Sequence, residues 1–254
     1  MLIADDTGLV GGLNIATEYA SLADGGMGWR DTMVKISSPA VSELVRLFLD
    51  LWERPQIRHG SRGELCFARQ ALGCNIRVLG SSHLTPRREI AAEYRAAVNS
   101  ARRTVWIANP YFLPSASFRR ALRKAAKNGV DVRIMVPARS DVSPVLWAAQ
   151  CSYERYLQWG IRLFEWTGPA LHAKMAVIDG EWSTVESFNL DHQSLLHNLE
   201  ITVVVVDRTF GHQVEAVFKE DFSQCRELFV ATWRARGLDR QLRERWWAIF
   251  RMLL

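Results

Sequence analysis

Five side chains in the second half of the chain have types and spacing that suit chemistry on a phosphate ester. His172, Lys174 and Asp179 follow the pattern H-x-K-x(4)-D, and Ser187 and Asn189 come shortly after it. An imidazole can transfer a proton, an ammonium group can bind a phosphoryl oxygen, and the hydroxyl and carboxamide can add hydrogen bonds. A histidine or lysine that stands alone is more often structural or solvated. The combination favours a phosphodiester site, because a buried lysine is costly without an anionic partner.

The elements around this motif would bring its polar groups to one face. Side chains alternate along a strand, so the histidine and lysine of H-x-K point to the same side. The apolar run 175–178 predicts a buried strand, and Asp179 begins a strong hairpin signal. With a two-residue loop at 180–181, we expect Lys174 to lie opposite Ser187 and the histidine to lie opposite the asparagine.

A weaker copy of the pattern opens the chain in the sequence MLIADDTGLVGGLN. An internal alignment with one residue fewer in the turn pairs Met1 with Met175, Asp5 with Asp179, Gly12 with Ser187, and Asn14 with Asn189. The counterparts of the histidine and lysine would then lie just upstream of Met1. We expect an incomplete first half-site, because a chain that starts in mid-strand beside a buried site is an unusual solution. The alternative is that Met1 is a genuine start and that Asn14 is a loop residue.

Composition agrees with an α/β enzyme that has a sizeable core and an anionic partner. The 254 residues include 32 Lys and Arg against 27 Asp and Glu, which gives a net charge of +5 and an isoelectric point near 9.2. The cysteines lack metal-ligand spacing, and reduced thiols are expected at Cys66, Cys74, Cys151 and Cys225. No metal-binding or nucleotide-binding motif is present, so neither a metal nor a cofactor is expected. The sequence also has no signal peptide and no apolar run of membrane-spanning length.

The motif in the second half closely resembles the H-x-K-D motif of the phospholipase D superfamily, whose members usually join two such motifs into one phosphodiester site. The resemblance spans nearly the whole chain. It includes the segment 109–141, NPYFLPSASFRRALRKAAKNGVDVRIMVPARSD, and the segment 194–200, SLLHNLE. This wider pattern is more similar to bacterial cardiolipin synthases than to the nuclease members. It implies a phosphatidyltransferase with one complete half-site.

The resemblance implies a role for each residue that matches the motif. His172 would be one of two paired catalytic histidines, acting as the general acid that protonates the leaving alcohol and later activates the acceptor. Lys174 and Asn189 would bind phosphoryl oxygens in the transition state, and Ser187 would add a hydrogen bond. Glu200 would accept a hydrogen bond from the His172 ring and fix its tautomer. Asp179 is counted with the catalytic motif, but we expect it to be structural at the hairpin.

In the first half-site, the resemblance implies substrate contacts from Gly12, Asn14 and Asp31. The segment 29–31 is similar to the W-R-D segment of the family, whose aspartate orients the first histidine. Because that histidine is missing here, we expect Asp31 to have no histidine to orient.

Glu186 is a departure from the family pattern, which usually has glycine before the serine. A carboxylate beside a phosphate site would repel the substrate or pair with Lys174. We expect the Glu186 side chain to alternate away from Ser187 and so to leave the site usable.

Strands that alternate with amphipathic helices predict an α/β fold, a phospholipase D-like mixed β-sheet sandwiched by helices. We expect a partial first lobe at 1–55, a linker at 56–75, a complete second lobe at 76–237 and a C-terminal amphipathic helix at 238–254. The predicted strands cover 1–4, 9–11, 32–37, 76–80, 104–108, 132–136, 161–165, 174–178, 183–185 and 201–206. The predicted helices cover 39–52, 87–101, 115–128, 142–159 and 209–228.

The C-terminal segment LDRQLRERWWAIFRMLL predicts a helix with two different faces. At helical spacing one face carries Leu242, Trp246, Ile249 and Leu253, and the other carries Arg240, Arg243, Glu244 and Arg251. An apolar, tryptophan-rich face flanked by arginine suits the surface of an anionic membrane. The alternative is a helix docked on the protein's own core, which is the usual position of an amphipathic helix. We favour the membrane surface.

Three classes of function remain. The resemblance favours a phosphatidyltransferase of cardiolipin synthase type, acting on phosphatidylglycerol through a phosphohistidine intermediate, as a peripheral protein on the cytoplasmic face of the bacterial inner membrane. The second class is a phosphodiesterase or nuclease that two single-motif chains complete by dimerisation. The third is a catalytically inactive fragment. The C-terminal helix and the lack of a clear aromatic and basic surface favour a phospholipid over nucleic acid as partner, and a homodimer is left open.

Overall fold

The computed structural model describes residues 1–37, 40–52, 75–81, 88–191 and 198–250. Its strands are β1 (Leu2–Ala4), β2 (Thr7–Gly11), β3 (Met33–Ser37), β4 (Ile76–Ser81), β5 (Thr104–Ala108), β6 (Asp131–Pro137), β7 (Arg162–Trp166), β8 (Met175–Ile178), β9 (Trp182–Glu186), β10 (Glu200–Val206) and β11 (Cys225–Leu228). Its α-helices are α1 (Val41–Trp52), α2 (Arg88–Ser100), α3 (Ala116–Lys127), α4 (Ser143–Gln150), α5 (Tyr153–Gln158), α7 (Arg208–Ser223), α8 (Val230–Arg234) and α9 (Leu238–Ile249). Two short 3-10 helices, η1 (Thr17–Tyr19) and η2 (Leu22–Asp24), lie in the loop between β2 and β3.

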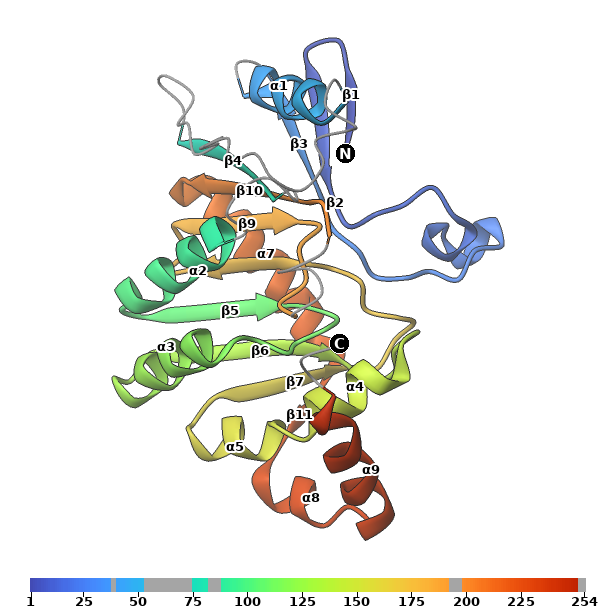
Figure 1. Cartoon of the computed structure of the whole chain (residues 1–254), viewed down its shortest axis with the longest axis vertical. Helices are drawn as coiled ribbons and strands as arrows, with labels where there is room; N and C mark the ends of the chain where they lie inside the picture. The colour runs from blue at the N-terminus through green and yellow to red at the C-terminus, as the bar shows by residue number, and fades with distance from the viewer. Residues whose placement is uncertain (38–39, 53–74, 82–87, 192–197, 251–254) are drawn as a thin grey trace, which may run out of the picture.

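Two β-sheets organise these elements (Figure 1). The larger sheet is mixed and has the strand order β11-β7-β6-β5-β8-β9-β10-β4, and the smaller sheet is antiparallel with the order β1-β2-β3. Side chains alternate across the larger sheet, so that Ile107 and Ile134 pack on the face that α2 and α3 cover. Trp106 and Met135 pack on the opposite face with α7 and the smaller sheet. The structure therefore has the expected α/β fold with helices on both faces of a mixed sheet.

The first hairpin of the chain is a shorter copy of the hairpin that carries the H-x-K motif. In both hairpins the turn begins with an aspartate in the left-handed conformation, with φ of 50° at Asp5 and 55° at Asp179. The turn between β1 and β2 contains two residues, because Ala4 pairs with Thr7. The turn between β8 and β9 contains three, because Ile178 pairs with Trp182. The structure confirms the internal alignment, including its one-residue difference in the turn.

The expected register of the second hairpin is wrong by one residue. We predicted a two-residue turn with Lys174 opposite Ser187, but Asp179 adds a third residue to the turn by adopting positive φ. Lys174 therefore lies opposite Glu186, whose backbone N–H donates to the Lys174 carbonyl at 3.1 Å. The polar groups still converge, because they lie beyond the paired ends of the strands.

Other differences concern the C-terminal half. The helix predicted at 142–159 is divided into α4 and α5, where Ser152 N bonds to Ala149 O in a tight i to i−3 contact at 2.9 Å. The helix predicted at 209–228 ends at Ser223, and its last residues form the edge strand β11, paired with β7. Helical periodicity continues through this short strand, so the sequence did not reveal it.

Strand β4 pairs with β10 and so belongs to the larger sheet. Most of the predicted linker 56–75 lies outside the described residues.

Asp179 performs a structural task at the hairpin, as expected. Its carboxylate accepts hydrogen bonds from the backbone N–H groups of Arg102, Arg103 and Thr104 at 2.8, 2.7 and 2.9 Å. These bonds join the turn of the hairpin to the start of β5. Asp179 lies beyond the far end of β8 from His172, and it does not line the pocket described below.

We expect Asp179→Ala to lower the free energy of unfolding by about 3 kcal/mol, because three backbone donors lose a charged acceptor. Asp179→Asn keeps the oxygen that serves Arg103 and Thr104 and tolerates positive φ, so its loss should be less than half as large. Urea unfolding measures both values. Equal losses in the two variants would contradict this account of the carboxylate.

Candidate active site

A pocket of about 370 Å³ lies where the smaller sheet meets the larger one. Its lining combines residues of both hairpins: Met1, Gly11, Gly12, Leu13, Asn14, Leu47, His172, Lys174, Ser187, Asn189, Leu199, Glu200 and Ile201. The structure thus brings His172, Lys174, Ser187 and Asn189 together, as predicted. It also places Gly12 and Asn14 in the same pocket, which confirms that the first hairpin faces the motif of the second.

The segment that follows η2 holds the backbone of His172 in place. Arg30 forms an isolated β-bridge with Leu171, and its carbonyl accepts from the N–H groups of His172 and Ala173 at 2.8 and 3.0 Å. The Arg30 guanidinium makes a two-pronged ion pair with Asp221 of α7, at 2.8 Å for each hydrogen bond. Backbone and side chain of one residue therefore tie the first lobe to the motif.

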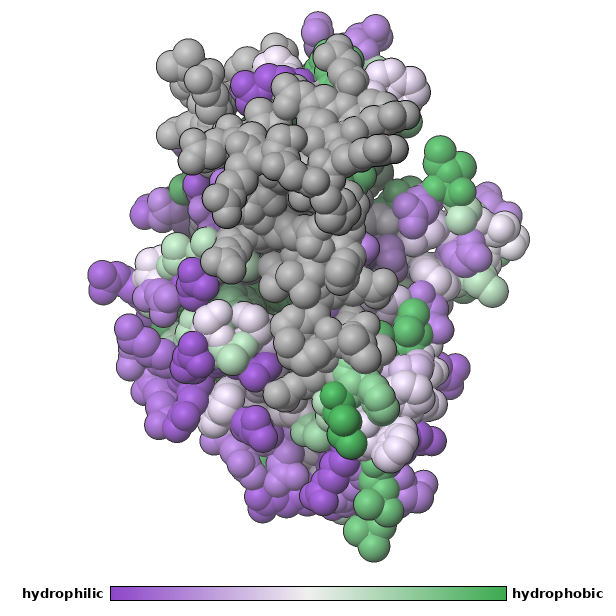
Figure 2. All heavy atoms as spheres, in the orientation of Figure 1, coloured by the Kyte–Doolittle hydropathy of each residue, from purple (hydrophilic) through white to green (hydrophobic). Residues whose placement is uncertain are grey.

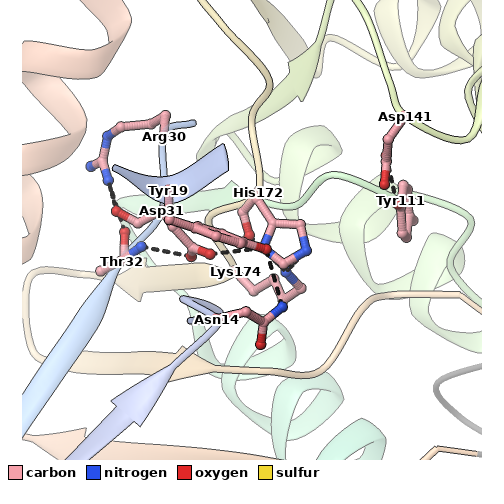
Figure 3. A network of polar contacts seen from close by, with 9 residues as sticks. All are labelled: Asn14, Tyr19, Arg30, Asp31, Thr32, Tyr111, Asp141, His172 and Lys174. Carbon is pink, nitrogen blue, oxygen red and sulfur yellow. Dashed lines mark hydrogen bonds and ion pairs between the residues drawn. The ribbon is translucent and has the colours of Figure 1, made fainter. Parts of the chain in front are cut away.

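Asp31 is the carboxylate that contacts the His172 imidazole. Its Oδ2 lies 2.7 Å from Nδ1 of His172, and its Oδ1 accepts from the N–H of Thr32 at 2.7 Å (Figure 3). The Asp31 side chain is fully buried, whereas the histidine ring stays partly open to the pocket. The expectation that Asp31 has no histidine to orient was wrong. The ring and its carboxylate come from different lobes, so neither residue's own motif identifies the pair.

Glu200 does not hold the His172 ring, although the family resemblance implied that it would. Its Oε2 accepts from the Ser187 hydroxyl at 2.5 Å, and its Oε1 accepts from the Asn198 amide at 3.2 Å. Ser187 in turn accepts from the N–H of Ile201 at 3.0 Å. Glu200 therefore lines the pocket, and its bonds hold the end of β9 against β10 instead of holding the His172 ring.

Lys174 is almost completely buried beside the histidine. It is 2 % exposed, and its Nζ donates to the His172 carbonyl at 2.7 Å and lies 3.1 and 3.2 Å from the two ring nitrogens. Burial lowers the pKa of Lys174 to about 8, while the charges of Asp31 and Glu200 act in the opposite direction. An ammonium group with so little solvation is well suited to bind an incoming phosphoryl oxygen.

Glu186 points away from the substrate side, as expected. Its carboxylate accepts from the Tyr94 hydroxyl of α2 and from the Thr202 hydroxyl at 2.8 Å, in the layer beneath the pocket. Burial raises the pKa of Glu186 to about 8, so the group is readily neutralised. It does not line the pocket and does not block it.

Tyr19 is a site residue that the sequence did not reveal. Its hydroxyl lies 3.2 Å from His172 Nδ1 and accepts from the Asn14 amide at 3.1 Å (Figure 3). Its ring and that of Trp29 pack beside the imidazole, with centroids 5.5 and 5.9 Å from it. Burial raises the pKa of Tyr19, so the hydroxyl stays protonated at neutral pH. Nothing in the spacing around Tyr19 signals this position, because η1 folds it back over the motif of the other lobe.

Asn189 and Gly12 leave room and bonding capacity for a ligand. The Oδ1 atom of Asn189 is buried without a hydrogen-bond partner in the described part of the chain. A Cβ atom at Gly12 would lie 2.7 Å from Asp31 Oδ1 and 3.1 Å from Lys174 Nζ, so only glycine fits against these two charged groups. The pocket thus combines an imidazole held by a carboxylate, a buried ammonium group, and an amide oxygen that can still accept a hydrogen bond. Within the described ranges no group of His, Cys, Asp and Glu side chains is arranged to hold a metal ion.

A family model described as "Cardiolipin synthase, PLD-like domain" matches residues 94–222, which span most of the larger sheet and the whole H-x-K hairpin. The chain belongs to this family. Among curated relatives, cardiolipin synthase A of Pseudomonas entomophila is 35% identical over 230 residues, which cover 87% of this chain and 46% of the relative. Probable cardiolipin synthase YwiE of Bacillus subtilis is 30% identical over 258 residues, covering 98% of this chain and 50% of the relative. The chain therefore spans about half the length of the curated relatives it matches.

Solved structures agree on the fold. Phosphatidylserine synthase of Haemophilus influenzae superposes with a TM-score of 0.77 at 14% identity, over 98% of this chain and 69% of that one. The phospholipase D family member Nuc of Salmonella typhimurium superposes with a TM-score of 0.52 at 22% identity, over 61% of this chain and 97% of that one. The fold of nearly the whole chain thus has a counterpart in one solved protein.

Proposed function

We propose that this chain carries a half-site for phosphatidyl transfer of the cardiolipin synthase type, with phosphatidylglycerol as donor and acceptor. The observation that carries the proposal is the Asp31–His172 pair beside the buried Lys174, in a pocket that both lobes line. The relatives that are cardiolipin synthases by name support the choice of a lipid substrate.

The proposed reaction has two steps that share His172. A histidine of the other half-site attacks phosphorus, the phosphorus–oxygen bond to glycerol breaks, and His172 donates a proton from Nε2 to the departing oxygen. The hydroxyl of a second phosphatidylglycerol then gives its proton back to His172 while its oxygen attacks phosphorus and releases the first histidine. Asp31 holds Nδ1 throughout and so keeps Nε2 directed to the substrate. Lys174 and Asn189 bind the phosphoryl oxygens, whose charge is greatest in the transition state.

The pocket residues that the structure describes do not include a histidine that could attack phosphorus while His172 acts as the acid. His172 is the only histidine that lines the pocket among the described residues, and no other histidine in the sequence stands in an H-x-K context. By the alignment of β1 with β8, the counterparts of residues 172–174 would come directly ahead of Met1, which lines the pocket together with Glu200. We propose that Glu200 faces the second imidazole, as Asp31 faces the first.

This proposal is tested with a designed variant, called here the extended chain, in which His-Ala-Lys is placed directly ahead of Met1. The assay follows cardiolipin and glycerol formed from phosphatidylglycerol in mixed micelles. Formation of phosphatidic acid in place of cardiolipin would identify water as the acceptor and favour a phosphodiesterase. Cleavage of single-stranded or double-stranded DNA without lipid turnover would favour a nuclease.

We expect Asp31→Asn in the extended chain to lower kcat by about 10²-fold or more, because the imidazole loses the carboxylate that fixes its tautomer. The exposed Asp6→Asn, in the turn between β1 and β2, is the matched control and should leave kcat unchanged. Urea unfolding of both variants tells a loss of chemistry from a loss of fold. An Asp31→Asn variant with full kcat would remove Asp31 from the mechanism.

The proposed partner is a phospholipid at a membrane surface, where the chain acts as a peripheral protein on the cytoplasmic face. In the described ranges no helix has both the length and the apolar character needed to cross a bilayer. A lipid substrate nevertheless requires the pocket to meet a membrane or micelle surface. Nucleic acid as substrate is tested by the DNA cleavage assay, and a homodimer by the dependence of the rate on protein concentration.

A further inference from the structure

Helix α9 is docked with its charged face inward and its apolar face outward. Glu244 is 1 % exposed, accepts from Arg236 at 2.7 Å and pairs with Arg240 at 3.3 Å. On the same side Trp247 packs against Trp147 of α4, with ring centroids 6.1 Å apart. An amphipathic helix whose partner is its own domain normally turns its apolar face to the core. The opposite orientation rules out the protein's own core as the partner of the apolar face.

The outward face is a continuous apolar stripe. Leu238, Leu242, Trp246 and Ile249 are 75, 64, 61 and 70 % exposed, and helical geometry places them within about 80° of one another around the axis. Figure 2 shows hydrophobic residues among hydrophilic neighbours at the lower right of the molecule, where Figure 1 places α9. Contiguous exposed apolar surface of this kind marks an interaction site more often than a solvent-facing helix.

We infer that this stripe docks α9 flat on an anionic phospholipid surface. The exposed charges beside the stripe are mainly basic and fit such a surface, with Arg245 on one side of it and Asp239 followed by Arg243 on the other. A second copy of the chain is a poorer occupant, because it would bring a second set of mainly basic flanks to the stripe in place of an anionic surface. The helix covers 12 residues and is too short to span a bilayer, so it would lie in the plane of the interface.

The orientation that follows suits a lipid enzyme. In Figure 1, α9 and the loop with η1 and η2 lie on the same side of the larger sheet as the connection that leads into β8 and carries His172. That loop also exposes large apolar side chains, Leu22 at 70 % and Met27 at 58 %. A surface that touches α9 would therefore lie on the same side as the segment that leads into β8. The choice of a lipid surface as the occupant rests on the proposed function. The outward orientation of the apolar stripe is an observation that does not depend on that function.

The test is sedimentation of the whole chain with vesicles of phosphatidylcholine alone and of phosphatidylcholine mixed with phosphatidylglycerol. We expect binding to the mixed vesicles, weakened by salt, and at least about tenfold weaker binding for Leu242→Gln combined with Trp246→Gln. Both side chains are mostly exposed, so the melting temperature should not change. Arg245→Gln should weaken binding to the mixed vesicles alone. Val217→Gln, an exposed apolar position on α7, is the matched control and should bind as the unchanged chain does.

Two results would overturn the inference. One is equal binding of the unchanged chain and the double variant to the mixed vesicles, or no binding by either. The other is a concentration-dependent dimer that the double variant abolishes, because the stripe would then be covered by a second copy. Failure of the proposed function is read separately, as absence of cardiolipin formation by the extended chain in detergent micelles, where docking on a bilayer is not required.

Discussion

The 254-residue chain by itself is expected to form cardiolipin from phosphatidylglycerol at least about 10³-fold more slowly than the extended chain. The reason is the content of the pocket: His172 can donate a proton, but the lining residues that the structure describes include no second imidazole to attack phosphorus. Electrostatic stabilisation by Lys174 and Asn189 cannot replace that covalent step. The measurement is the initial rate in mixed micelles, at a protein dilution where light scattering reports a monomer.

Three variants control this prediction. An extension of Asn-Ala-Lys should restore no activity, and His172→Asn within the extended chain should abolish it again. His212→Asn on α7, where the side chain is 67% exposed, should have no effect. Rapid turnover by the short monomeric chain would contradict the reading of the pocket. A rate that rises with the square of protein concentration would instead indicate that two copies complete the site.

The pocket could be predicted from sequence because its main members are neighbours along two hairpins. Alternation along a strand fixes the relation of His172 to Lys174, and the copy of the motif at the N-terminus brings Asn14 to the same place. These relations survive a register error of one residue, since the residues concerned lie beyond the paired strands. The register itself depended on the backbone conformation of Asp179, which no periodic pattern reports.

The partner of the His172 imidazole could not be predicted in the same way. Asp31 and His172 are 141 residues apart, and the contact forms only because the first lobe folds over the second. Both Asp31, in the W-R-D segment, and Glu200, at the end of the segment 194–200, carry a carboxylate that could accept a hydrogen bond from an imidazole. Sequence alone could not decide which of the two contacts His172. Tyr19 was missed for a related reason, since a 3-10 helix in the loop between β2 and β3 brings it to the ring.

The C-terminal helix shows a different limit. Periodicity correctly grouped Leu242, Trp246 and Ile249 on one face, but it says nothing about which face turns inward. That choice depends on Glu244, which finds Arg236 of the preceding loop as a buried partner. A periodic sequence pattern identifies the two faces of a helix, but only tertiary contacts decide which of the faces turns inward.

Lys174→Met is expected to abolish transfer in the extended chain and, at the same time, to raise the stability of the folded protein. Transfer is lost because the phosphoryl oxygens lose their buried cation in the transition state. Stability rises because Lys174 is 2 % exposed and its charge is poorly solvated, whereas methionine has a similar length and no charge. Burial lowers the pKa of Lys174 from 10.5 to about 8, which corresponds to an upper limit of about 3 kcal/mol.

The sign of this effect fixes its dependence on pH. Between pH 8 and pH 10.5 the unfolded chain keeps a proton on Lys174 that the folded protein releases, so the cost of burial grows as pH falls through this range and is complete below pH 8. The gain in unfolding free energy of Lys174→Met should therefore be largest at neutral pH and small above pH 10.5. Lys127→Met, at an exposed position on α3, should change neither stability nor transfer. For the unmutated extended chain, kcat/KM should fall as pH rises through about 8, when the ammonium group loses its charge. A destabilised Lys174→Met protein, with its melting temperature lowered at pH 7, would mean that the lysine is held mainly by its carboxylate neighbours and not strained by burial.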